Sequence, residues 1–142
     1  MKKLLIASHG DLAKGMLSSI EMITGSTAGI TTINAYQEAV DLDSELTAFI
    51  HSLKEEDEVF VFTDLYGGSV NQKITERFIR EKQGIRIVSG FNFPVILEIL
   101  LGPESIDSAL LVGMIEKARN ELQVNVLDPQ QAVDDSEEDF FI

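Results

Sequence analysis

The sequence predicts an α/β domain built around a mainly parallel, doubly wound sheet. Four short apolar runs recur at intervals of about 25 to 30 residues, and the pattern between them changes to a helical period. Strands that alternate with helices favour a parallel sheet, because right-handed crossovers place helices on both of its faces. There is no internal repeat, and no linker rich in Gly, Ser or Pro precedes residue 128. We therefore expect one domain over residues 1–127.

The predicted strands are the four apolar runs themselves, over residues 4–7, 30–33, 59–62 and 85–88. Their expected order in the sheet is 2-1-3-4, the order typical of small doubly wound folds. A fifth segment, 122–127, alternates apolar and polar residues and is predicted to be an edge strand.

Helical periodicity fills the intervals between the strands. In the first helix the apolar stripe includes Met16 and Ile20, Asp11 is a candidate N-cap, and Gly25 is the expected stop. The later helices are predicted over residues 42–53, 70–78, 94–101 and 106–120. Met16 and Met22 are both expected to be packing residues of the first helix.

The last residues are strongly acidic. Five of them carry carboxylates, at positions 134, 135, 137, 138 and 139. Residues 128–142 are interpreted as a mobile acidic tail, with attraction of a basic partner protein as the alternative.

Composition excludes several kinds of function. The chain has no cysteine, which rules out disulfides, thiolate metal sites and thiol nucleophiles. Its formal net charge of −13 and scattered basic residues make nucleic acid a poor partner. No run of about 20 apolar residues is present to span a bilayer, and the apolar run after Lys3 is too short for a signal peptide. We therefore expect a cytoplasmic protein, linked to membranes only through partners, with no metal and no cofactor.

Two segments should meet at the ligand-binding edge of the sheet. In doubly wound sheets this edge lies beyond the carboxyl ends of the strands, where the strand order reverses. The first strand delivers His9 there and the third delivers Asp64, followed by the turn Gly67-Gly68-Ser69.

These residue types suit transient phosphorylation. A carboxylate at Asp64 can fix the tautomer of His9 and leave the other ring nitrogen nucleophilic. Backbone amides of Gly67 and Gly68, at the start of a helix, favour an anion, and the Ser69 hydroxyl can add a hydrogen bond. A lone histidine after a strand is ordinarily a solvated side chain, so the hypothesis depends on the three features together. The other histidine, His51, is assigned no role.

Four segments resemble the IIA components of the mannose family of the phosphoenolpyruvate-dependent sugar phosphotransferase system (PTS). They are Ser8-His9-Gly10, Glu21-Met22-Ile23-Thr24-Gly25, Asp64-Leu65-Tyr66-Gly67-Gly68-Ser69 and Gly90-Phe91-Asn92-Phe93-Pro94, which in order and spacing cover most of residues 3–127. Many relatives have proline after Gly-Gly-Ser, where this chain has Val70.

The resemblance implies a phosphotransferase component that acts through a phosphohistidine. His9 would accept phosphate from the phosphocarrier protein HPr and pass it to a sugar-specific IIB protein on a separate chain, with IIC and IID components in the membrane. Asp64 would orient the histidine, and Ser69 with the Gly67-Gly68 amides would hold the phosphoryl group. Met22, Ile23 and Tyr66 would dock the partners.

The resemblance also implies a homodimer in which the strand over 122–127 pairs antiparallel with the sheet of the other subunit. Three other functions stay open. The first is the phosphoryl-donor subunit of a PTS-dependent dihydroxyacetone kinase, although that subunit typically has Gly-Ser-Ala after its aspartate. The second is a non-catalytic nucleotide or flavin module, and the third is a regulatory domain phosphorylated on histidine.

Overall fold

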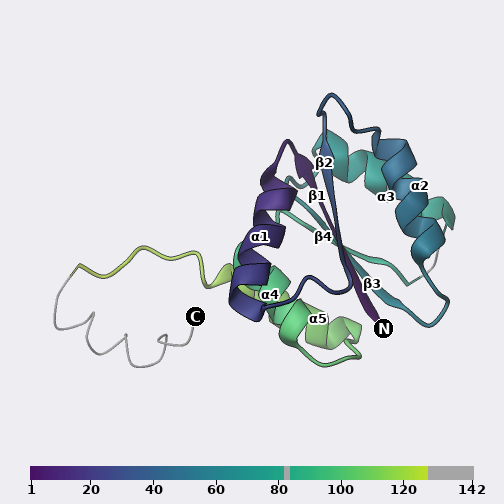
Figure 1. Ribbon diagram of the computed structural model, residues 1–142. Coiled ribbons are helices and arrows are strands. Elements are labelled where there is room, and N and C mark those ends of the chain that lie inside the picture. The colour runs from purple at the N-terminus through teal and green to yellow at the C-terminus, as the bar shows by residue number, and fades with distance from the viewer. Residues whose placement is uncertain (82–83, 128–142) are drawn as a thin grey trace.

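The computed structural model describes residues 1–81 and 84–127, and it confirms the predicted fold class and strand order (Figure 1). All pairings in the sheet are parallel, in the order β2-β1-β3-β4. The strands are β1 (Lys2–His9), β2 (Ile30–Ala35), β3 (Glu58–Thr63) and β4 (Arg86–Ser89). The helices are α1 (Leu12–Thr24), α2 (Leu42–Ser52), α3 (Ser69–Glu81), α4 (Phe93–Leu101) and α5 (Ser108–Arg119).

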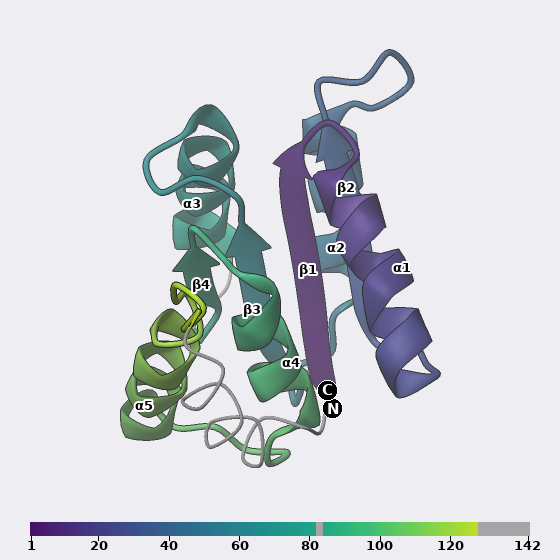
Figure 2. The ribbon, with the colours of Figure 1, turned by 90° about the vertical axis from the view of Figure 1, so that its left-hand side faces the viewer.

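Helices cover both faces of the sheet, so β1 is buried on both sides (Figures 1 and 2). Leu4 and Ile6 belong to an apolar cluster with residues of α1, α4 and α5. The alternate residues Leu5 and Ala7 belong to a second cluster with residues of α2 and α3. Successive side chains of a strand point to opposite faces, which explains why the central strands are apolar at nearly every position.

The start of α1 differs from the prediction. Asp11 lies at the N-cap position, but its side chain makes no capping hydrogen bond. The buried hydroxyl oxygen of Ser8 accepts from the amide of Ala13 at 2.8 Å, and the side chain of Asn34 accepts from the amide of Lys14 at 3.1 Å. The free amides of the first turn are thus bound by residues of β1 and β2. At the other end of the helix, Gly25 is the predicted left-handed C-cap.

In the segment between β4 and α4, one side chain contacts two helices. Asn92 is the N-cap of α4, and its side-chain oxygen accepts from the amide of Val95 at 2.9 Å. Its amide nitrogen donates to the carbonyl of Ala118 in α5 at 2.7 Å. One side chain therefore starts α4 and fixes α5 against it.

Residues 122–127 pair with no described strand in this single chain, so the predicted edge strand is not formed here. Leu122, Val124 and Leu127 are each about nine-tenths exposed, and the segment extends away from the domain (Figure 1). The predicted acidic tail, 128–142, lies outside the described residues. Among the described helices, none has both the length and the apolar character to cross a membrane.

Candidate functional site

The carboxyl ends of β1 and β3 bring the two main candidates together. The strands are neighbours, with Ala7 paired to Thr63, so His9 at the end of β1 and Asp64 just after β3 lie at the same edge of the sheet. They are 55 positions apart in the sequence, and the chain between them forms α1, β2 and α2.

His9 makes two hydrogen bonds to one oxygen of Asp64. The Oδ2 atom lies 2.8 Å from the backbone nitrogen of His9 and 2.8 Å from its Nδ1. An ionised carboxylate only accepts, so Nδ1 carries the proton and Nε2 has the free lone pair. The carboxylate is one-tenth exposed or less, whereas the imidazole is two-fifths exposed. The nucleophilic nitrogen therefore remains accessible while its partner is shielded.

The pKa of Asp64 lies below its ordinary value. Burial of the carboxyl raises this pKa, but the hydrogen bonds from the backbone and the ring of His9, with the charge of that ring, more than offset the effect. Asp64 is thus ionised at neutral pH and can stabilise positive charge on the imidazole.

Ser69, the first residue of α3, faces the free ring nitrogen. Its Oγ lies 3.4 Å from Nε2 of His9. The first-turn amides of a helix have no acceptor within the helix, and the helix dipole is positive at this end. A phosphoryl group on Nε2 would lie next to this hydroxyl and the start of the helix.

The Gly67-Gly68 turn shapes the loop, but its amides already have protein acceptors. The amide of Gly67 donates to the side chain of Asn71 at 3.2 Å, and that of Gly68 donates to the carbonyl of Leu65 at 3.1 Å. Gly67 has φ +73°, and a Cβ on Gly68 would lie 3.0 Å from the Cβ of Leu65. Backbone donors for an anion would therefore come from the first turn of α3 rather than from the two glycines.

Asn71 holds this turn from beneath, a role that the sequence did not predict. Its side-chain nitrogen donates to Thr63 Oγ1 at 2.9 Å and to Ser89 Oγ at 2.7 Å, while its oxygen accepts from Gly67. Asn71 and Thr63 are buried. The network ties the start of α3 to the ends of β3 and β4.

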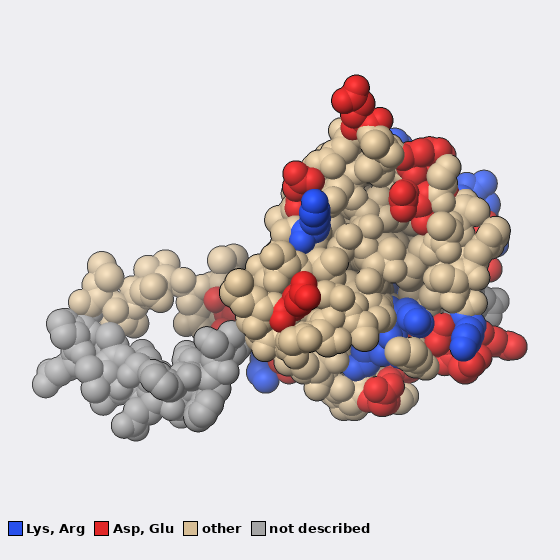
Figure 3. All heavy atoms as spheres, in the orientation of Figure 1, with Lys and Arg blue, Asp and Glu red and all other residues tan. Residues whose placement is uncertain are grey.

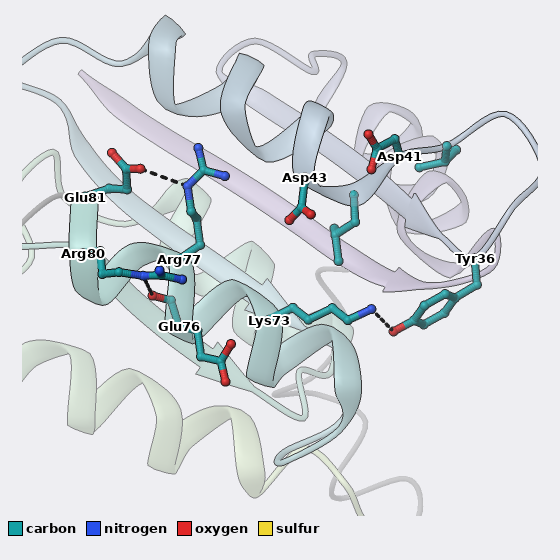
Figure 4. Close-up of a pocket in the computed structure, with 10 residues that line it drawn as sticks. Tyr36, Asp41, Asp43, Lys73, Glu76, Arg77, Arg80 and Glu81 are labelled. Carbon is teal, nitrogen blue, oxygen red and sulfur yellow. Dashed lines mark hydrogen bonds and ion pairs between the residues drawn. The ribbon is translucent and has the colours of Figure 1, made fainter.

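Tyr36 also belongs to the site and was not a sequence candidate. Its ring centroid lies 5.2 Å from that of His9, and its hydroxyl donates to Ser69 Oγ at 2.6 Å. The ammonium group of Lys73 lies 3.4 Å from the Tyr36 hydroxyl (Figure 4). Nothing in the sequence marks a tyrosine one residue after the second strand, because its proximity depends on how β2 lies against β1.

Two of the three predicted docking residues, Met22 and Ile23, lie away from His9. Helix α1 begins beside the end of β1 and runs back toward the opposite edge of the sheet (Figure 2). Met22 and Ile23 therefore lie about 15 Å along the helix from its start. Met22 is 86% exposed, so its predicted packing role is wrong, whereas Met16 packs against the core. Tyr66, 88% exposed, lies in the loop between Asp64 and α3.

Outside the site, the structure also places the second histidine and the surface charges. His51 is exposed in the last turn of α2. In residues 1–81 and 84–127, no three His, Asp or Glu side chains cluster closely enough to hold a metal ion. On the face shown in Figure 3, Lys and Arg occur in small groups interrupted by acidic and uncharged side chains.

Comparison with known proteins identifies the family. A family model described as PTS system fructose IIA component matches residues 3–124. The PTS system fructose-specific EIIA component of Bacillus subtilis (strain 168) is 28% identical over 102 residues, which are 70% of this chain and 69% of that protein.

Two solved structures agree with this match. A Klebsiella pneumoniae protein assigned to a phosphoenolpyruvate-dependent sugar PTS permease is 32% identical, with a TM-score of 0.75 over 87% of this chain and 90% of that one. The PTS IIA protein associated with the fucose utilization operon of Streptococcus pneumoniae is 30% identical, with a TM-score of 0.73 over 87% and 92%. Together with the sheet order, these matches show that the chain belongs to the mannose and fructose family of PTS IIA components.

Proposed function

We propose that this chain is a cytoplasmic carrier that receives a phosphoryl group from HPr on Nε2 of His9 and passes it to a separate IIB component. The observation that carries the proposal is the pair of hydrogen bonds from His9 to Asp64, which leaves Nε2 as the accessible nucleophile. Family membership supports a transferase role with HPr and IIB proteins as partners.

In the first step the lone pair of Nε2 forms a bond to phosphorus while the bond from phosphorus to the donor breaks, and the donor retains that electron pair. The ring keeps its proton on Nδ1 and becomes positively charged. Asp64, 2.8 Å away, offsets this charge. The second step is the reverse with a new partner, in which the acceptor's nucleophile attacks phosphorus and the electron pair of the P–N bond returns to Nε2.

Ser69 and the first turn of α3 would hold the phosphoryl oxygens. The hydroxyl lies 3.4 Å from Nε2, within reach of a group attached there. Phosphoryl transfer depends largely on positioning and charge stabilisation, which suits a site built from hydrogen-bond donors and a helix terminus. The exposed edge around His9 leaves room for a partner protein to present its own phosphorylated residue.

Partner docking and assembly extend the proposal. Tyr66 lies in the loop of the site and is a candidate contact for either partner, while Met22 and Ile23 would contact only a partner that extends along α1. We further propose that 122–127 pairs with a second subunit, because its alternating apolar side chains are exposed in the single chain. IIC and IID components would supply the membrane link.

In the direct test, the chain is incubated with phosphoenolpyruvate, enzyme I and HPr, and an acid-labile phosphoryl adduct is sought by mass spectrometry. Wild type and His51→Ala should be phosphorylated, whereas His9→Ala should not. His51 is the matched control, since it is the only other histidine of the chain. Phosphate on His9→Ala, or none on wild type, would contradict the proposal.

A second experiment asks which acceptor protein removes the phosphoryl group from the phosphorylated chain. Discharge to a IIB protein supports a transport role, whereas discharge to a dihydroxyacetone kinase subunit would establish the alternative function. His9→Gln removes the acceptor nitrogen and Asp64→Ala removes its orienting group, so the two variants separate these roles.

A further inference from the structure

Beyond His9, Asp64 and Ser69, a chain of hydrogen bonds leads away from the site toward α3. Lys73 Nζ donates to the hydroxyl of Tyr36 at 3.4 Å, and that hydroxyl donates to Ser69 Oγ at 2.6 Å. The bond from Tyr36 uses a lone pair of the serine oxygen, so the serine hydrogen is directed elsewhere. Its neighbour on the other side is Nε2 of His9, 3.4 Å away.

We propose that Tyr36 and Lys73 are positioning residues that orient the Ser69 hydroxyl toward the phosphoryl group on His9. The inference rests on the proposed function. Every donor in the chain points in the same direction, from the ammonium group to the phenol, from the phenol to the serine and from the serine to the ring nitrogen or its phosphoryl group. A positive charge at the far end strengthens each donor in turn.

The backbone of Tyr36 gives an independent reason to assign it a role. Its φ is +64°, and among the described residues it is the only one other than glycine with a positive φ. This conformation is unfavourable for a residue with a Cβ, and such strain concentrates at functional sites. The left-handed bend follows directly after β2 and places the tyrosine ring beside His9.

The phenol is coupled to both of its neighbours in this chain of hydrogen bonds. Its hydrogen bond with Ser69, followed by the Lys73 side chain, holds the pKa of Tyr36 below its ordinary value despite some opposing burial. Lys73 also lies 5.1 Å from the centroid of the Tyr36 ring, which keeps the cation near the phenol.

Lys73 lines a groove beside the site. The groove has a volume of about 770 Å³ and lies between α3 and the segment from Tyr36 to Asp43 (Figure 4). Tyr36 and Lys73 line its end nearest Ser69. The cation thus faces the tyrosine rather than the carboxylates along the rest of the groove.

The test is a double-mutant cycle with phospho-HPr as the donor. Tyr36→Phe keeps the ring but removes the hydroxyl, and we expect it to lower kcat for phosphorylation of His9 about 10-fold with KM nearly unchanged. Ser69→Ala should lower kcat at least as much. The double variant should be no slower than Ser69→Ala, because Tyr36 acts through Ser69.

Lys73→Gln is the second variant, and a smaller loss of about 3-fold in kcat is expected because Lys73 reaches Ser69 only through Tyr36, across two hydrogen bonds. Lys117→Gln on α5 is its matched control, since within the described residues that lysine pairs with Glu98 at the surface, and it should transfer at the wild-type rate.

Wild-type rates in Tyr36→Phe, losses that multiply in the double variant, or a change confined to KM would each overturn the positioning role while leaving the proposed function intact. A wild-type chain that phospho-HPr does not phosphorylate on His9 would overturn the proposed function itself.

Discussion

A single oxygen of Asp64 binds both the backbone and the ring of His9, with the two nitrogens each 2.8 Å away. The first bond fixes the end of β1 against β3, and the second fixes the tautomer of the imidazole. Structure and chemistry therefore depend on the same carboxylate.

Replacing Asp64 with Asn should lower the rate of phosphorylation of His9 by about 100-fold or more, since the neutral amide cannot stabilise the charged ring and no longer selects one tautomer. Stopped transfer reactions analysed by mass spectrometry would measure the rate. Asp43→Asn, on the exposed side of the α2 start, is the comparison variant and should retain its transfer rate. Equal rates in Asp64→Asn and wild type would show that the carboxylate does not act on the ring.

The stability supplied by Asp64 should depend on pH. Its folded pKa is lowered, so the ionised carboxylate stabilises the fold fully above its unfolded pKa of about 4, and this contribution is lost as pH falls through the folded pKa. Urea unfolding of wild type and Asp64→Asn should therefore differ at pH 7, and the difference should shrink below about pH 4. A difference independent of pH would contradict the assignment of an ionised carboxylate.

Asn71→Ala should lower the free energy of unfolding by about 1 to 3 kcal/mol, because Thr63, Ser89 and the amide of Gly67 would each lose a hydrogen-bond partner. Urea denaturation measures this loss. Thr63→Val, which removes only one member of the network, should cost less than Asn71→Ala. The reverse order would indicate that Asn71 does not organise the network.

Substitutions at Tyr36 should separate stability from transfer. Tyr36→Gly relieves the left-handed backbone and should leave the free energy of unfolding unchanged or raise it by about 1 kcal/mol, whereas Tyr36→Val should lower it. Both variants lose the hydroxyl and should transfer phosphate more slowly. A valine variant as stable as the glycine variant would show that the backbone at this position carries no strain.

The sequence predicted the architecture because its signals are local and repeated. Apolar runs mark β1 to β4, and Gly25 ends α1 where the periodicity stops. The pairing of His9 with Asp64 could also be predicted, since parallel topology brings the ends of neighbouring strands together.

Other features depend on side-chain directions that no local pattern encodes. Tyr36 reaches Ser69 only because its backbone turns left-handed after β2, and Ser8 replaces Asp11 as the capping side chain because it is buried beneath the first turn of α1. The docking role of Met22 and Ile23 was predicted from the family resemblance alone. The direction of α1 places them away from His9.

The bond between the Asp64 carboxylate and the backbone amide of His9 has a consequence for exchange between partners. Because the fold itself orders the imidazole before a partner binds, the binding of the donor or acceptor protein does not have to offset the entropic cost of ordering it. A preorganised nitrogen of this kind presents the same geometry to both. In the proposed relay, donor and acceptor would then use one shared surface in turn, and the direction of transfer would depend on their relative phosphoryl potentials.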